Sequence, residues 1–294
     1  MPEGGVFLSA QIINGRALAA QIYAELDERV KVLKSKGVTP RVALVLVGYN
    51  EMSTRYVSLK QAAATSHSME CIVYHLAEET PQEKLVELIH NLNDDELIHG
   101  IMVQMPLPEH MDTTEVLDEI APTKDIDGLH FCNTGKLLNS LPSIVACTPR
   151  AIMRILDNLN VELESSHTVV VGRSTLVGRP IAICLLNSNA TVSVCHSHTK
   201  NLGEITRTAD VLIVAAGNAG LIKADMVKEG AIVIDVGQTS IDGKLYGDVD
   251  FDEVSKKAGY ITKVTGGVGP MTVAMLMTNL VDCAELSIIK RTNL

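Results

Sequence analysis

Two residues in the first half of the chain have side chains and a spacing suited to proton transfer. Tyr56 and Lys60 are four residues apart, so on a helix they share one face. A lysine held beside a phenol in a partly closed site has a lowered pKa and can shuttle a proton. The same pair also suits a solvated helix face, so the spacing alone leaves both interpretations open.

Other polar residues stand where α/β proteins place ligands. Gln104 ends a predicted strand, and the carboxyl ends of strands in open α/β sheets face ligands. Asp125 and Asp127 lie in a KDIDG turn, where a carboxylate can accept two hydrogen bonds from an amino-substituted heterocycle. Asp-Gly is also an ordinary turn sequence. GGVGP, residues 266–270, allows a ligand to approach the backbone closely, or forms a tight helix entry.

The stretch TVVVGRSTLVGRP, residues 168–180, has the features of a phosphate-binding turn. Val169–Val171 predicts a buried strand, Gly172 and Gly178 a turn, and Pro180 the start of a helix, whose N-terminus attracts anions. The glycine spacing is looser than GxGxxG, and such turns also occur without a ligand.

The next predicted strand indicates which dinucleotide this turn would bind. It runs from Ala190 to Cys195 and ends in His-Ser-His-Thr, where an NAD site usually has an acidic residue for the ribose hydroxyl. Arg173, Ser197 and protonated His198 would instead attract a 2′-phosphate. These residues favour NADP over NAD, although polar residues also simply end strands.

The order of the predicted elements indicates an α/β fold with two domains. Helices are predicted over 13–37, 53–67, 81–92, 112–121, 150–159, from 180, 201–208 and 271–286, and strands over 41–47, 71–76, 99–104, 169–171, 190–195, 210–216, 231–236 and 260–264. This alternation predicts parallel sheets. We expect an N-terminal three-layer α/β catalytic domain, residues 1–148, and a C-terminal Rossmann-like nucleotide-binding domain, residues 149–270. The last helix, 271–294, is expected to return to the first domain.

Composition narrows the class of protein. The 294 residues carry a net charge of −10, which argues against a nucleic-acid partner. We find no apolar run approaching the roughly 20 residues that span a bilayer, and no signal or transit peptide, so we expect a cytoplasmic protein without a membrane partner. The six scattered cysteines predict reduced thiols, and the histidine spacing predicts no metal site.

These motifs also allow two other interpretations of the function. YxxxK is also found in short-chain dehydrogenases, but there it follows the nucleotide fold, whereas here it precedes the glycine turn by over a hundred residues. A non-enzymatic NADP-binding regulatory module would leave the polar strand ends of the first half without a role.

Taken together, the motifs resemble the bifunctional methylenetetrahydrofolate dehydrogenase/cyclohydrolase family over nearly the whole chain. The matching stretches are STRYVSLK, HGIMVQMPLP, PTKDIDGLH, CTPRAIMRIL, VVVGRSTLVGRPIA, ATVSVCHSHT, GAIVIDVG, GDVDF and GGVGPMTVAMLM. The resemblance implies oxidation of 5,10-methylenetetrahydrofolate with NADP and hydrolysis of the methenyl product to 10-formyltetrahydrofolate. It also implies a homodimer with a folate cleft between the two domains.

The resemblance further implies roles for particular residues. Lys60 would be the catalytic lysine, assisted by Tyr56, with Gln104 at the reacting centre and Asp127 holding the pterin. The folate site would include Ser53, Val103, Met105, Thr265, Gly266, Gly267, Val268 and Gly269, and NADP would contact Gly172, Arg173, Ser174, Ser197, Thr148 and Gln238.

The chain also departs from the usual family pattern. Lys263 and Thr265 replace two prolines before the GGVGP stretch, and Gln238 replaces an apolar residue expected near the cofactor. His198 stands where Lys or Arg is common. We expect the fold to be unaffected and the cofactor preference and dehydrogenase rate to be sensitive to these changes.

Overall fold

The computed structural model describes residues 9–292 and divides the chain into two compact units. The six-stranded unit contains the described residues up to Ala19 together with Thr148–Thr272. The three-stranded unit contains Ala20–Cys147 and the chain from Val273 onward. Residues 1–8 and 293–294, which the predicted domain limits include, lie outside the described part.

The six-stranded unit is built on one parallel sheet with the order β1-β11-β8-β7-β5-β6. Its strands are β1 (Gln11–Ile13), β5 (His167–Val171), β6 (Thr191–Cys195), β7 (Val211–Val214), β8 (Ile232–Asp235) and β11 (Tyr260–Thr262). From β5 the chain runs to β6 on one side and returns to β7 on the other. This reversal creates a topological switch point at the carboxyl ends of β5 and β7, where doubly wound sheets bind ligands.

Short elements connect these strands. They are α6 (Cys147–Asn158), whose first residue belongs to the other unit, α7 (Gly178–Asn187), α8 (Leu202–Thr206), a 3₁₀ turn (Ala224–Met226), a hairpin of β9 (Thr239–Ile241) and β10 (Lys244–Tyr246), and α9 (Phe251–Val254). Apolar β-branched residues such as Val169, Val214 and Val233 fill the core beneath them.

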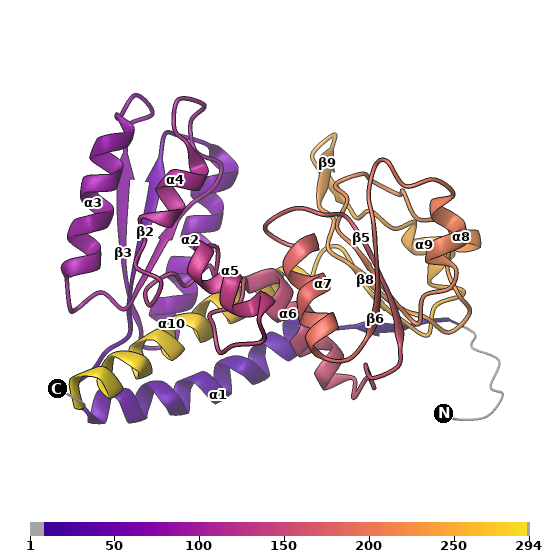
Figure 1. Cartoon of the computed structure of the whole chain (residues 1–294), viewed down its shortest axis with the longest axis horizontal. Coiled ribbons are helices and arrows are strands. Elements are labelled where there is room, and N and C mark those ends of the chain that lie inside the picture. Colours follow the sequence, from indigo (N-terminus) through magenta and orange to yellow (C-terminus); the bar gives the residue numbers. More distant parts are fainter. Residues whose placement is uncertain (1–8, 293–294) are drawn as a thin grey trace. The chain divides into compact units, whose positions relative to one another are not determined.

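The three-stranded unit has a parallel sheet with the order β3-β2-β4. Its elements are β2 (Arg41–Val47), α2 (Glu51–Ser66), β3 (Glu70–Leu76), α3 (Gln82–Asp94), β4 (Gly100–Val103), α4 (Thr113–Asp118) and α5 (Phe131–Leu138). The central strand β2 is buried on both faces, and Figure 1 shows α3 and α2 on opposite sides of the sheet. This unit therefore has the three layers that its continuous apolar strand predicts.

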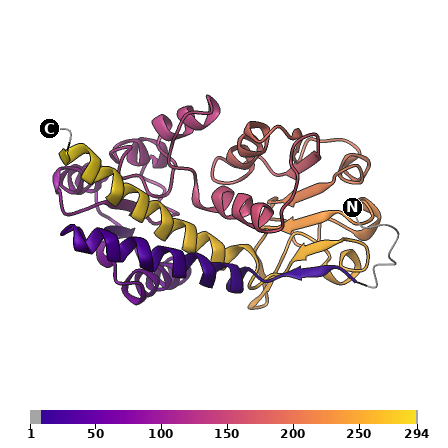
Figure 2. The ribbon, with the colours of Figure 1, turned by 90° about the horizontal axis from the view of Figure 1, so that it is seen from below.

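Two long helices, α1 (Gly15–Ser35) and α10 (Val268–Thr292), complete the three-stranded unit with most of their length. They run side by side in Figures 1 and 2, and Arg29 of α1 donates to Asp282 at 2.6 Å and to Glu285 at 2.7 and 2.9 Å. The predicted return of the last helix is confirmed.

Three expectations about elements were wrong. Ile13, the expected start of the first helix, is the last residue of strand β1 and pairs with Thr262. A short strand at a sheet edge shows no sequence period of its own, so the sequence did not predict it. No helix was predicted between residues 121 and 150, but α5 lies there. We expected no apolar run long enough to span a bilayer, but Val268–Ile289 is long and apolar enough by length and composition. More than half of this stretch is buried inside the protein, as in a core helix.

Candidate active site

Lys60 and Gln104 are in direct contact in the three-stranded unit. Lys60 Nζ donates to Gln104 Oε1 at 2.8 Å, and Gln104 Nε2 donates to the Met105 carbonyl at 2.7 Å. The second bond orients the amide, so that its oxygen faces the lysine. Gln104 itself is buried at the end of β4. The two predicted residues, 44 positions apart in sequence, thus form one unit.

Helix α2 supplies the other side chains near this contact. Tyr56 lies one turn before Lys60 and is 38% exposed. Ser53 is buried in the first turn, and its hydroxyl donates to the Met105 carbonyl at 3.4 Å. Asn50 caps the helix by accepting from the Ser53 N–H at 3.1 Å. The cap fixes where α2 begins and hence where Lys60 emerges.

Charge links Asp127 to Lys60. Burial lowers the pKa of the Lys60 ammonium, and the negative charge of Asp127 opposes that shift. Burial in turn raises the pKa of the Asp127 carboxyl, while Lys60 and a hydrogen bond with Cys147 lower it. A lysine with a lowered pKa beside a carboxylate can give up and regain a proton more easily than a free lysine.

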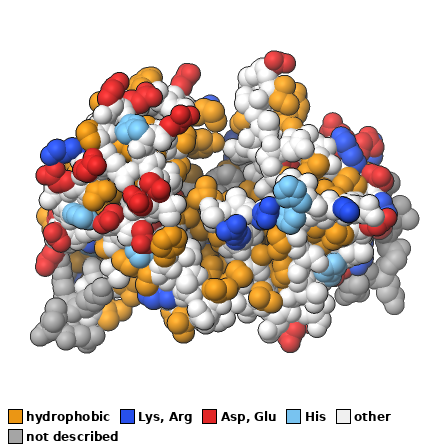
Figure 3. Space-filling model, turned by 45° about the horizontal axis from the view of Figure 1, so that its top comes forward, with side chains coloured by type: hydrophobic (Ala, Val, Ile, Leu, Met, Phe, Trp, Pro, Cys, Tyr) orange, Lys and Arg blue, Asp and Glu red, His pale blue; other side chains and the backbone are white. Residues whose placement is uncertain are grey.

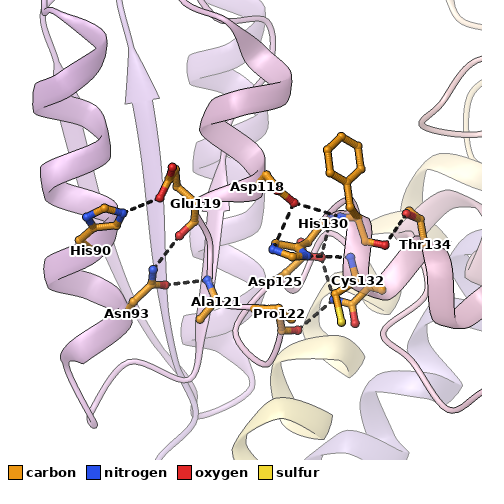
Figure 4. Close-up of polar contacts among 12 residues, drawn as sticks. His90, Asn93, Asp118, Glu119, Ala121, Pro122, Asp125, His130, Cys132 and Thr134 are labelled. Atoms are coloured by element: carbon orange, nitrogen blue, oxygen red, sulfur yellow. Dashed lines mark hydrogen bonds and ion pairs between the residues drawn. The ribbon is translucent and has the colours of Figure 1, made fainter.

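Asp125 has a structural role, unlike Asp127. It is 2% exposed and accepts from the backbone N–H groups of Gly128 at 3.0 Å and His130 at 2.9 Å, and from Asn133 Nδ2 at 2.9 Å. Figure 4 shows this carboxylate among the polar contacts that tie the loop before α5 together. Of the two aspartates in the KDIDG turn, Asp125 is the structural one.

The same network anchors the loop to neighbouring helices. Asn93 of α3 donates to the Glu119 carbonyl at 2.7 Å and accepts from the Ala121 N–H at 2.8 Å, and His90 pairs with the Glu119 carboxylate at 2.6 Å. His130 pairs with Asp118 at 3.2 Å (Figure 4). The loop that carries Asp127 is therefore held along most of its length.

The remaining expected folate residues of this unit differ in exposure. Met105 is partly exposed, and its carbonyl receives the two bonds described above. The Val103 side chain, in contrast, is 1% exposed and packs in the core between the sheet and α3. Val103 as a whole is therefore almost inaccessible in this structure.

In the six-stranded unit, the glycine turn is as close-packed as a phosphate cradle requires. Gly172 has φ +121°, and a Cβ there would collide with the Ala215 carbonyl at the end of β7. A Cβ on Gly178 would collide with the Gly172 carbonyl. Ser174 Oγ accepts from the N–H groups of Val177 at 3.2 Å and Gly178 at 3.3 Å, so it ties the turn to the start of α7. This geometry fits a pyrophosphate at the N-terminus of α7.

The predicted 2′-phosphate residues emerge from adjacent strands. Val171 and Cys195 are register partners of β5 and β6, and Arg173 and Ser197 each lie two residues beyond them and are exposed. His198 is also exposed, and its backbone N–H donates to His196 Nδ1 at 3.2 Å. On the face drawn in Figure 3, lysine, arginine and histidine side chains gather on this unit, whereas acidic side chains are frequent on the three-stranded unit.

The other expected ligand residues of this unit lie near the start of α10. Thr148 and Thr272 share a hydrogen bond of 3.2 Å. Gln238 is exposed, and its Nε2 lies 3.4 Å from where a Cβ of Gly269 would stand. Thr265 is exposed and Gly266 has φ +100°, whereas Gly267 and Val268 are buried. The substituting Lys263 stacks its ammonium over the Phe251 ring, 5.5 Å from the centroid.

Sequence reasoning missed several residues that organise these sites. Cys147, Asn279, Asp235 and Asp248 are all buried. Cys147 and Asn279 bond the loop that carries Asp127, Asp235 accepts from the Gly237 N–H beside Gln238, and Asp248 bonds the loop after β7. Cys147, Asp235 and Asp248 lie in the matched motifs CTPRAIMRIL, GAIVIDVG and GDVDF. An Asp or Cys within such a motif could have indicated a buried residue that holds the site.

Comparison with known proteins identifies the family. Residues 13–127 match the family described as "Tetrahydrofolate dehydrogenase/cyclohydrolase, catalytic domain", and residues 146–288 match its NAD(P)-binding domain. The bifunctional protein FolD of Campylobacter concisus is 47% identical over 95% of this chain and 99% of its own. The chain belongs to the tetrahydrofolate dehydrogenase/cyclohydrolase family.

Solved structures of this family agree with the fold. The bifunctional FolD enzyme of Campylobacter jejuni superposes with a TM-score of 0.93 at 48% identity, covering 95% of this chain and 99% of that one. The FolD of Trypanosoma brucei, solved with NADP cofactor and an inhibitor, gives 0.91 at 39% identity over 98% and 99%. The predicted family, two-domain α/β fold and bifunctional dehydrogenase/cyclohydrolase enzyme are confirmed.

Proposed function

We propose that the three-stranded unit of this dehydrogenase/cyclohydrolase binds the folate and carries the acid–base chemistry, while residues of the six-stranded unit bind NADP. The enzyme oxidises 5,10-methylenetetrahydrofolate to the methenyl form and hydrolyses that product to 10-formyltetrahydrofolate. The observation that carries the assignment is the 2.8 Å bond between Lys60 Nζ and Gln104 Oε1, with the charge of Asp127 acting on the same lysine.

Four side chains of the three-stranded unit, Asp127, Tyr56, Gln104 and Lys60, have separate roles in this scheme. The Asp127 carboxylate accepts hydrogen bonds from the pterin, Tyr56 lies beside the substrate on the face of α2, and Gln104 orients Lys60. In the hydrolysis, water adds to the cationic methenyl carbon and loses one proton, which gives a carbinol. The carbinol hydroxyl then loses its proton and becomes the formyl oxygen, while the nitrogen of the adjacent C–N bond gains a proton and that bond breaks, so that one proton is released overall. Lys60, whose pKa burial lowers, moves these protons.

Six residues receive NADP in this proposal. Gly172, Arg173 and Ser174 lie at the glycine turn, Ser197 at the end of β6, Thr148 at the start of α6, and Gln238 after β8. When bound, the nicotinamide accepts the hydride, so the protein has only to bind and orient the two reactants. The close packing of Gly172 and the exposed Arg173 and Ser197 support the placement.

Ser53, Val103 and Met105 of the three-stranded unit contact the folate in the same scheme, and the assignment of residues 265–269 to the folate stays a prediction from the family resemblance. The enzyme acts as a homodimer in the cytoplasm. Its six cysteines are all free, which supports a reducing compartment, and immunoblotting of cell fractions tests the location.

One assay tests the activity directly. Purified enzyme is mixed with 5,10-methylenetetrahydrofolate and NADP, or NAD, and reduced cofactor is followed by absorbance, while methenyltetrahydrofolate alone is used for the hydrolysis. We expect reduction with NADP, little with NAD, and hydrolysis without cofactor. Comparable rates with NAD would contradict the roles of Arg173 and Ser197, and absence of both reactions would contradict the proposal as a whole.

A further inference from the structure

The loop that carries Asp127 is fixed on both sides of that residue. Asp127 lies between two peptide groups. The one before it contains the Ile126 carbonyl, and the one after it contains the Gly128 N–H. A side chain can hold its direction only if these two groups do not rotate, because their rotation changes the backbone angles of Asp127. Each of the two groups has a buried partner.

Asn279 of α10 holds the group before Asp127. Its Nδ2 donates to the Ile126 carbonyl at 2.7 Å and to the Val145 carbonyl at 3.0 Å, and it lies 3.6 Å from Cys147 Sγ. Asn279 is completely buried, as is the Ile126 side chain. One amide group, 153 residues away in sequence, thus joins the Asp127 loop to the segment that ends in Cys147.

Asp125 holds the group after Asp127. Its carboxylate accepts from the Gly128 N–H at 3.0 Å and is itself fixed by Asn133. Gly128 has φ +72°, and a Cβ there would lie 2.6 Å from the Ala146 nitrogen. The loop therefore lies directly on the backbone of 145–146, whose Val145 carbonyl also accepts from Asn279.

We propose that Asn279 is a positioning residue for the reaction: its amide fixes the Ile126 carbonyl and the Cys147 sulfur, and so sets the Asp127 carboxylate beside Lys60. This inference rests on the proposed function of Asp127 and Lys60. Asn279 carries no charge, and it bonds the Ile126 and Val145 carbonyls and the Cys147 sulfur. It therefore acts through the placement of Asp127 and of Cys147, whose sulfur influences both Lys60 and Asp127.

The effect on chemistry follows from distance. The attraction between two charges falls with separation, and a displacement of about 1 Å in an active site can lower the rate about 10²-fold. If Asp127 moves away, Lys60 loses the charge that opposes its desolvation, so the pKa of Lys60 falls further. Folate contacts weaken at the same time, while the six-stranded unit is unaffected.

Two variants of the intact enzyme test the proposal. Asn279→Ala removes every donor of the amide, and Asn279→Ser keeps a shorter donor and serves if the first variant does not fold. We expect kcat/KM for methylenetetrahydrofolate and for methenyltetrahydrofolate to fall about 10- to 100-fold in Asn279→Ala, with a smaller loss in Asn279→Ser. The limb of the hydrolysis pH profile that belongs to Lys60 should move to lower pH, and the Kd for NADP, measured by calorimetry, should stay within about twofold.

Two control variants separate position from stability. Thr278 is the buried neighbour of Asn279 on α10, but its hydroxyl donates to the Ala274 carbonyl of its own helix at 2.9 Å, so Thr278→Val removes a buried polar group without touching the loop. Ile89→Ala creates a cavity in the core on α3 and lowers the melting temperature of the same unit. Neither control should shift the pH profile.

An Asn279→Ala or Asn279→Ser enzyme that keeps wild-type kcat/KM and pH profile would overturn the proposal. So would a pH shift of equal size in Ile89→Ala, because the change would then reflect stability. If wild-type enzyme lacked both activities, or Lys60→Met kept full hydrolysis, the proposed function would fail instead, and the two failures are therefore distinguishable.

Discussion

At the scale of single residues, the proposed chemistry depends on one ammonium group. Lys60 donates to Gln104 and is subject to two opposing influences, burial and the charge of Asp127. Gln104 has its own second bond to Met105, so it is a fixed acceptor. A proton carrier with an oriented partner is what the hydrolysis of a methenyl cation requires.

Replacing Lys60 by methionine tests this role. Lys60→Met keeps the length of the side chain and removes the proton carrier, so we expect hydrolysis of methenyltetrahydrofolate to fall by about 10²- to 10⁴-fold while folate still binds. The loss of methenyl absorbance measures the rate. Lys84→Met on the exposed face of α3 is the matched control, and unchanged hydrolysis in Lys60→Met would exclude Lys60 as the proton carrier.

Arg173 tests the cofactor preference. Its exposed guanidinium follows the glycine turn, beside the strand end that carries Ser197. Arg173→Ala should raise KM for NADP by about tenfold or more and leave KM for NAD nearly unchanged, because only NADP has a 2′-phosphate for the arginine to bind. Dehydrogenase assays with each cofactor measure both values, and an equal rise for the two would contradict the assignment.

At the scale of elements, two buried carboxylates hold the strand ends of the six-stranded unit. Asp248 accepts from the N–H groups of Ala216, Gly217 and Asn218 after β7, at 2.6 to 2.8 Å. Asp235 accepts from Gly237, Asp248 and Val249, each at 3.0 Å. The loops after β7 and β8 are therefore fixed before a ligand arrives.

The Asp235 carboxyl makes the stability of the six-stranded unit depend on pH. Burial raises its pKa to about 6, although the three N–H groups act in the other direction. The folded protein thus holds this proton more tightly than the unfolded chain, so the contribution of Asp235 to stability is full below about pH 4 and is lost as the pH rises through about 6. The loss corresponds to about 3 kcal/mol.

Urea unfolding from pH 4 to pH 7 measures the effect. Relative to Asp235→Asn, which cannot ionise, wild type should lose roughly 2.5 kcal/mol of unfolding free energy over this range, because part of the full change already falls below pH 4. A constant difference between the two proteins would mean that Asp235 titrates at the ordinary pKa of an aspartate.

At the scale of the whole molecule, the prediction concerns assembly. We expect a homodimer, so sedimentation equilibrium should give about twice the chain mass of 31.7 kDa. Such a closed two-chain assembly is the commonest state of soluble oligomers. A single species at the chain mass, over the concentrations used in the assays, would contradict the expectation and leave the chemistry of each unit unaltered.

The sequence by itself determined the local features. The continuous apolar run predicted β2 at its observed bounds, and the YxxxK spacing placed Tyr56 and Lys60 one turn apart on α2. Gly172 was predicted to turn the chain, and it adopts a φ that favours glycine. These features depend on neighbours within a few residues, so a local pattern is sufficient to predict them.

Only the tertiary structure decided which distant residues meet. It joined β1 to β11, separated the structural Asp125 from Asp127, and brought Asn279 to the loop of Asp127. Nothing local in the last helix distinguishes Asn279 from Thr278, since both are polar residues in an apolar segment. The difference arises from packing, because a buried carbonyl must find a donor, and the helix that passes it supplies one from 153 residues away.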